Sequence, residues 1–115
     1  VTEMPNLTGA RPLGLRDKAP GKDPQHLARV GALPCVICTE YGEPQLSPTQ
    51  VHHCIHGRYS TRKAPDSMTI PLCEGHHQGL FDVSKLALHQ APSKWKRIYG
   101  PDTDWIGWVG ARLGA

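Results

Sequence analysis

Cysteine and histidine residues are concentrated in the middle of this chain, and their spacing constrains the fold more than any other feature. They occur in the order Cys35-x2-Cys38, His52-His53-Cys54 and Cys73-x2-His76-His77. Two thiols separated by two residues have the knuckle spacing of zinc sites, and a Cys-x2-His pair can complete such a site. The pattern predicts a domain built around zinc, with histidines left over for a second, open site.

The low apolar content makes a metal the expected source of stability. The 115 residues are 38% hydrophobic and include one Phe and 11 Pro, so the apolar core is expected to be small. A small core usually needs additional stabilisation, such as disulfides or a structural metal. The alternative is two disulfides in a secreted domain, which the knuckle spacing and the lack of a recognisable signal peptide disfavour. We therefore expect a reducing, cytoplasmic location. No apolar run approaches the roughly 20 residues that a bilayer requires, so no membrane partner is expected.

Positive charges are grouped along the chain, although the formal net charge is only +3. Clusters lie within residues 11–22, 58–63 and 94–97. Such clusters can follow the phosphates of a nucleic acid, or they can form an ordinary solvated surface.

The pattern of breakers and apolar residues divides the chain into three parts. Residues 1–22 are rich in Pro and Gly and are expected to be a flexible basic arm. Residues 23–92 carry the Cys and His motifs and form the predicted core. Residues 93–115 are predicted to be a C-terminal helical extension.

Local signals predict the elements of the core. Asp23 is the expected N-cap of a helix that ends at Gly31. A tight turn at residues 33–38 and a loop at 39–50 follow, and then two strands at 50–55 and 68–72. A helix is expected to begin near Cys73 or Glu74. In the extension, Ser93 and Asp104 are predicted to cap two further helices.

This order of motifs resembles a known family of nucleases. A Cys knuckle, a strand carrying His52-His53, and Pro71-Leu72-Cys73-x2-His76-His77 leading into a helix are similar to the HNH (ββα-metal) endonuclease superfamily. Within it, the motifs together with Gly57-Arg58 and Gln78 resemble the Ref (recombination enhancement function) nucleases of bacteriophages. The resemblance covers roughly residues 23–90.

The resemblance implies a fold and a function. The fold would be a small α+β, zinc-stabilised domain with a treble-clef (ββα-metal) core. The function would be that of a metal-dependent DNA endonuclease, phage-encoded, acting in the host bacterial cytoplasm. Its partners would be DNA and a RecA-type recombinase filament.

Structural zinc requires a closed shell of four nitrogen or sulfur ligands. Three thiolates are available in Cys35, Cys38 and Cys73, and His76 is the favoured fourth ligand. Cys54 is the alternative fourth ligand, or the ligand of another zinc; we favour the interpretation of Cys54 as a small buried apolar residue.

The remaining histidines suit phosphodiester chemistry. Alternation along a strand points His52 and Cys54 to one side and His53 to the other. His53 is the predicted general base, because imidazole titrates near working pH. His52 and His77 are the predicted ligands of a catalytic divalent cation (Mg, Mn, Ni or Zn). Asp82 and His89 are equal candidates for a third ligand.

The sequence departs from the superfamily at the middle residue, which is commonly Asn. This chain has Asp66 and Ser67 there, and either could take that role. Arg58, Arg62 and Lys63 are candidate phosphate contacts, with Arg58 favoured because Gly57 would let the loop approach DNA closely.

Another class of function fits the same residues. A zinc-ribbon module that binds DNA or protein without catalysis would need the Cys cluster but no general base. A module that docks on a recombinase filament is compatible with either interpretation, and the basic arm could add phosphate contacts. The oligomeric state is not set by any of these motifs.

Overall fold

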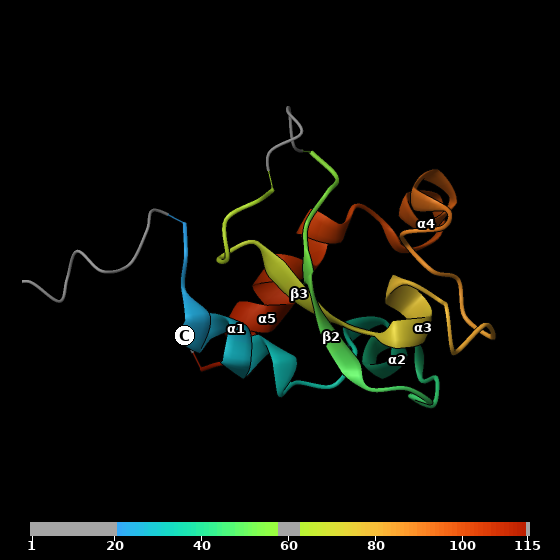
Figure 1. Cartoon of the computed structure of the whole chain (residues 1–115), viewed down its shortest axis with the longest axis horizontal. Coiled ribbons are helices and arrows are strands. Elements are labelled where there is room, and N and C mark those ends of the chain that lie inside the picture. Colours follow the sequence, from blue (N-terminus) through green and yellow to red (C-terminus); the bar gives the residue numbers. More distant parts are fainter. Residues whose placement is uncertain (1–20, 58–62, 115) are drawn as a thin grey trace, which may run out of the picture.

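An antiparallel pair of strands lies at the centre of the computed structural model of the protein, which describes residues 21–57 and 63–114 (Figure 1). Strand β2 (Thr49–His53) pairs with β3 (Thr69–Cys73), so that Val51 lies opposite Pro71. Every residue of β3 is buried. Proline lacks a donor for a further strand, and Pro71 is accommodated because β3 has a single strand neighbour in the described sheet. The strands begin and end within a few residues of the predicted ranges.

The helix predicted after Asp23 is present as α1 (Pro24–Gly31). The Asp23 carboxylate accepts a hydrogen bond from the backbone N–H of His26, as an N-cap does. The predicted turn at residues 33–38 and the loop at 39–50 are partly wrong, because a second helix, α2 (Val36–Tyr41), begins there. The Cys35 sulfur accepts the N–H of Cys38 at its start, and Gly42 ends it in the left-handed conformation (φ 67°).

The helix predicted near Cys73 is confirmed as α3 (Glu74–His77), but it lasts only about one turn. The Glu74 carboxylate accepts hydrogen bonds from three successive backbone N–H groups, those of residues 80, 81 and 82. Gly79 has φ 68°, and a Cβ there would lie 2.7 Å from that of Ala87. The chain is therefore turned back sharply, which places residues 87–89 beside α3.

The C-terminal segment contains α4 (Pro92–Tyr99), the 3-10 helix η2 (Asp102–Trp105) and α5 (Ile106–Arg112). The predicted caps are wrong. Helix α4 begins at Pro92 with no side-chain cap, and Asp104 lies inside η2. Proline presets the backbone of the first helical residue, so Ser93 is not needed as a cap.

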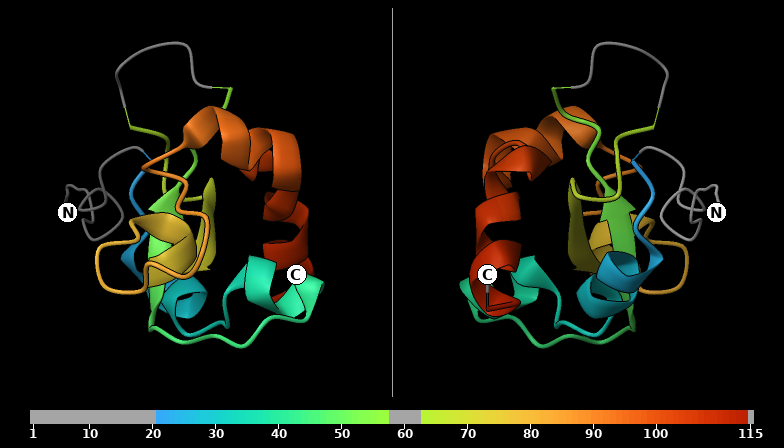
Figure 2. Two further views of the ribbon diagram at one scale, coloured as in Figure 1. Left: turned by 90° about the vertical axis from the view of Figure 1, so that its right-hand side faces the viewer. Right: turned by 90° about the vertical axis from the view of Figure 1, so that its left-hand side faces the viewer.

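Figure 2 shows α4 and α5 along one side of the hairpin. Trp95 and Val109 from these helices belong to the hydrophobic cluster that also contains Val30, Ile37, Ile70 and Leu72. The Arg29 guanidinium donates a hydrogen bond to the carbonyl of Leu113, which ties the end of the segment to α1. The described residues thus form a small α+β unit.

Some predictions concern residues that the structure does not describe. The arm prediction falls almost entirely on residues 1–20, and Arg58 and Arg62 also lie outside the described residues. Within residues 21–57 and 63–114, no helix has the length and apolar character needed to cross a bilayer.

Candidate metal centres and active site

Three cysteines and one histidine converge where the start of α2 meets the end of β3. Cys35 and Cys38 come from the first turn of α2, Cys73 ends β3, and His76 lies on α3. One ligand atom of each lies within 4.8 Å of the others, and all four residues are buried. These are the four residues predicted for structural zinc.

The distances between the ligand atoms of this cluster fit a tetrahedrally coordinated metal ion. The Nδ1 atom of His76 lies 3.5 Å from the sulfurs of Cys35 and Cys38 and 3.3 Å from that of Cys73. The sulfurs of Cys38 and Cys73 are 3.8 Å apart. Zinc with bonds of about 2.3 Å to sulfur and about 2.0 Å to nitrogen gives edges of about 3.8 and 3.5 Å. This buried group could therefore hold a metal ion such as zinc.

Electrostatics also call for a cation in this cluster. The hydrogen bond from Cys35 lowers the pKa of Cys73 to about 3, whereas contact with Cys73 and burial raise that of Cys35. Burial, and then the charge of Cys73, raises the pKa of Cys38 to about 11. One thiolate is favourable here and three are not, unless a metal ion compensates their charge.

Cys54 is not part of this cluster, so its prediction as an alternative zinc ligand is not supported. The four-residue group is complete without Cys54. Its side chain is buried, and burial followed by the nearby Asp102 carboxylate raises the pKa of its thiol to about 12. The residue therefore behaves as a small neutral core side chain, the interpretation favoured from the sequence.

A second group consists of His52, His77 and His89. One ring nitrogen of each lies within 4.8 Å of the others. The ring centroids are 5.0 Å apart for His52 and His77, and 4.6 Å apart for His77 and His89. His52 comes from β2 and His77 from α3. His89 is brought in because its backbone N–H donates to the carbonyl of His77.

His52 and His77, the two buried histidines of this group, each have one ring nitrogen within hydrogen-bond distance of an acceptor oxygen. His52 Nε2 lies 2.8 Å from a carboxylate oxygen of Asp102, and His77 Nδ1 lies 2.7 Å from Oε1 of Gln50. A neutral imidazole has one donor and one acceptor nitrogen. The acceptor atoms are then Nδ1 of His52 and Nε2 of His77. Burial, and then the neighbouring His52, lowers the pKa of His77 to about 4, which keeps that ring neutral.

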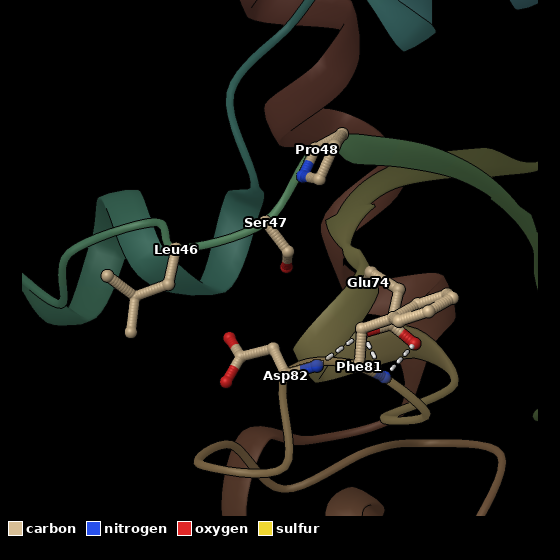
Figure 3. A pocket seen from close by; sticks show the side chains of 6 residues that line it. All are labelled: Leu46, Ser47, Pro48, Glu74, Phe81 and Asp82. Carbon is tan, nitrogen blue, oxygen red and sulfur yellow. Dashed lines mark hydrogen bonds between the residues drawn. The ribbon is translucent and has the colours of Figure 1, made fainter.

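Of the two candidates for a third ligand, the structure brings His89 and not Asp82 to this group. Asp82 lies in a different pocket, beside Leu46 and Ser47 (Figure 3). Its carboxylate accepts hydrogen bonds from the hydroxyl and backbone N–H of Ser84. The hydrogen bonds that the Glu74 carboxylate accepts from the N–H groups of residues 80–82 hold this loop, and Asp82 does not line the pocket of the three histidines.

His53 is paired with Asp66, one of the two residues predicted to replace the usual Asn. His53 Nε2 lies 2.8 Å from Asp66 Oδ1, and the hydrogen bond from His53 is the main cause that lowers the pKa of Asp66. Asp66 also accepts the backbone N–H of Asp23 through its other oxygen. The carboxylate thus fixes the Nε2–H tautomer of His53 and leaves Nδ1 as the basic atom.

His53 and the three-histidine group line one shallow pocket. The lining includes His52, His53, His77 and His89, together with Val51, Ile55, Lys63 and Gln78. The alternation predicted along β2 is present, since His52 is buried and His53 is partly exposed, yet both reach the pocket. Lys63 is a cation at its rim.

The sequence did not predict the outer partners of the histidines, that is, the residues that contact a histidine of either cluster without belonging to the cluster. Asp102 and Gln50 hold His52 and His77, and Glu43 Oε1 lies 3.4 Å from Nε2 of His76. Gln50 lies two residues before His52 on β2, so both side chains are on the same face of this strand. From there Gln50 contacts His77 of α3. Asp102 is 50 residues from His52, and no local motif marks it.

No protein-family model, curated protein or solved structure matches this chain.

Proposed function

We propose that this chain is a metal-dependent endonuclease of the HNH type, which hydrolyses phosphodiester bonds in DNA. The observation that carries the proposal is that His53, which is hydrogen-bonded to Asp66, lines the same pocket as His52, His77 and His89. A general base beside an open cation site is the arrangement that phosphodiester hydrolysis needs.

The order of elements supports the same assignment. The resemblance implies a treble-clef arrangement. It is supported by the order of a Cys knuckle, a β hairpin and a short helix that begins directly after Cys73. In this proposal the Cys35, Cys38, Cys73 and His76 cluster is structural, because four protein ligands leave no position for substrate. The three-histidine group has an open position, as catalytic sites do.

The donor set narrows the choice of cation. Three imidazoles suit Zn or Ni better than Mg or Mn, which prefer oxygen ligands. When bound, the ion would polarise the phosphate and stabilise the departing 3′ oxygen. His52, His77 and His89 would hold it, and the held nitrogens of His52 and His77 would keep those rings from rotating.

The protein's own part in the reaction centres on His53. Its Nδ1 takes a proton from water as the water oxygen bonds to phosphorus and the bond from phosphorus to the 3′ oxygen breaks. Asp66 accepts from Nε2–H throughout, so it orients the ring and stabilises the positive charge that develops on it. Lys63 lines the pocket and would contact a phosphate without reading bases.

The proposal is tested by incubating the full chain with plasmid and with single-stranded DNA in Zn, Ni, Mn or Mg. His53→Ala should lower the cleavage rate by roughly 10²–10⁴-fold, the usual contribution of a general base. Zinc content and the circular dichroism spectrum should not change, because His53 is outside the zinc cluster.

Two outcomes would count against the proposal. Undiminished cutting by His53→Ala would remove this residue from the mechanism. DNA that binds but stays intact with every cation would favour the zinc-ribbon binding module. The partnership with a recombinase remains a prediction of the resemblance, tested by adding a RecA-type filament to the same reactions.

A further inference from the structure

Asp102 is a buried carboxylate that the local sequence does not connect with any site. It begins η2 in the C-terminal segment and its side chain is fully buried. An isolated charge in such a place is costly unless it is paired and hydrogen-bonded. The partners of Asp102 therefore indicate why the residue is there.

Both oxygens of Asp102 are occupied by donors from one short stretch of chain. Oδ2 lies 2.8 Å from His52 Nε2 and accepts the N–H of Ile55 at 2.8 Å. Oδ1 accepts the N–H of His56 at 3.1 Å. In return, the backbone N–H of Asp102 donates to Nδ1 of His56. The carboxylate is thus held on all sides and cannot turn to bind a cation directly.

The consequence for His52 is a fixed orientation. Because a carboxylate only accepts, Nε2 of His52 must carry the proton and Nδ1 must carry the lone pair. Histidines that ligate metals usually donate their other N–H to a carboxylate or carbonyl, which fixes the tautomer and raises the basicity of the ligating nitrogen. Gln50 serves His77 in the same way, but without charge.

From this geometry we infer that Asp102 is the positioning residue for the three-histidine cation site. The inference rests on the proposed function and deepens it. The ligands come from β2, α3 and residue 89, and Asp102 supplies a negative charge beside them from the C-terminal segment. The segment predicted to be an extension then contributes a residue to the active centre.

The first test measures cation affinity without DNA. Wild-type full chain with zinc in its Cys cluster is titrated with Ni²⁺ by calorimetry, and the same is done for Asp102→Asn. We expect the variant to bind Ni²⁺ tenfold to hundredfold more weakly, the usual loss on removing an outer partner. Zinc content and thermal melting are followed in parallel.

A second readout reports the tautomer of His52 directly. Nitrogen NMR of the imidazole rings, recorded before Ni²⁺ is added, should show His52 protonated at Nε2 in the wild type. In Asp102→Asn it should show a mixture of tautomers. A merely structural role would leave this signature unchanged in any variant that folds.

His56→Ala is the matched control. It removes the contacts of the His56 ring with the backbone N–H and with Oδ1 of Asp102 (3.3 Å), and a bond to the carbonyl of Pro92, but keeps the His52–Asp102 pair. Its Ni²⁺ affinity should stay within about threefold of the wild type, well under the loss expected for an outer partner. If Asp102→Asn does not fold, Asp102→Ser is measured instead, because serine also removes the carboxylate from His52 and is small and polar.

The outcomes separate this inference from the proposed function. Equal Ni²⁺ affinity in wild type and the Asp102 variant, or an equal loss in His56→Ala, would overturn the positioning role alone. A wild-type chain that binds no Ni²⁺ beyond its zinc cluster would overturn both.

Discussion

The two metal-capable clusters differ in how they are built, although they use neighbouring residues of α3. The first takes three thiols and His76 from short local pairs, and all four are buried. The second takes three histidines from three separate segments, and His89 is exposed. A closed shell of four ligands suits a structural ion, whereas an open set of three suits chemistry. In the proposed function, the adjacent residues His76 and His77 therefore have different roles, one structural and one catalytic.

The outer partners sharpen this contrast. Glu43 lies beside His76 and also pairs with Lys85, a partly exposed arrangement. Asp102 beside His52 is fully buried, and its pKa is lowered because the hydrogen bonds from His52 and from the N–H of Ile55 outweigh the opposing effect of burial. The second cluster is therefore the one that has a fully buried carboxylate beside one of its histidines.

The largest expected effect is the difference between substituting His76, a member of the first cluster, and substituting its neighbour His77, a member of the second. His76→Ala should unfold the chain, because structural zinc contributes on the order of 10–16 kcal/mol in small domains, as much as their whole stability. His77→Ala should keep the zinc and the fold but lose the second cation. Circular dichroism melts and zinc content, measured for both variants, check this expectation.

Cys54→Ser controls for the loss of any buried side chain near these sites. Cys54 is buried outside the zinc cluster, so the variant should retain one zinc per chain. Equal zinc loss in Cys54→Ser and His76→Ala would show that the first cluster is not the zinc site.

A smaller effect distinguishes the two candidate third ligands. His89→Ala should weaken Ni²⁺ binding by more than the tenfold to hundredfold expected for loss of an outer partner, because a ligand itself is removed. Asp82→Asn should leave binding unchanged, since Asp82 lies in the pocket of Leu46 and Ser47. Calorimetric titration of both variants decides the matter, and the reverse ranking would place the cation beside Asp82 instead of His89.

The first cluster was predictable from the sequence because its ligands are local pairs with a two-residue gap, a spacing that itself encodes geometry. The start of α1 was predictable for the same reason, since Asp23 and Pro24 form an N-cap and first turn. Helix α2 was missed because its cap is the sulfur of Cys35, which is not among the usual capping groups.

The second cluster was predictable only in part, because tertiary packing completes it. His52 and His77 followed from their motifs, but the choice between Asp82 and His89 depended on a turn fixed by the Glu74 carboxylate. Asp102 reaches His52 through the docking of a whole segment, led by Trp95 and Val109. Contacts of that range leave no periodic or spacing signal in a single sequence.

The smallest expected effect concerns the rim of the second cluster and tests whether DNA lies there. Lys63→Ala should weaken DNA binding a few-fold and reduce the slope of log affinity against log salt by about 0.9, the change for one lost phosphate contact. Lys94→Ala on α4 is the control, because Lys94 does not line the pocket. Filter binding at several salt concentrations measures both slopes. An equal change in the two variants would mean that DNA responds to overall charge, and that the three-histidine pocket is not where the phosphate backbone lies.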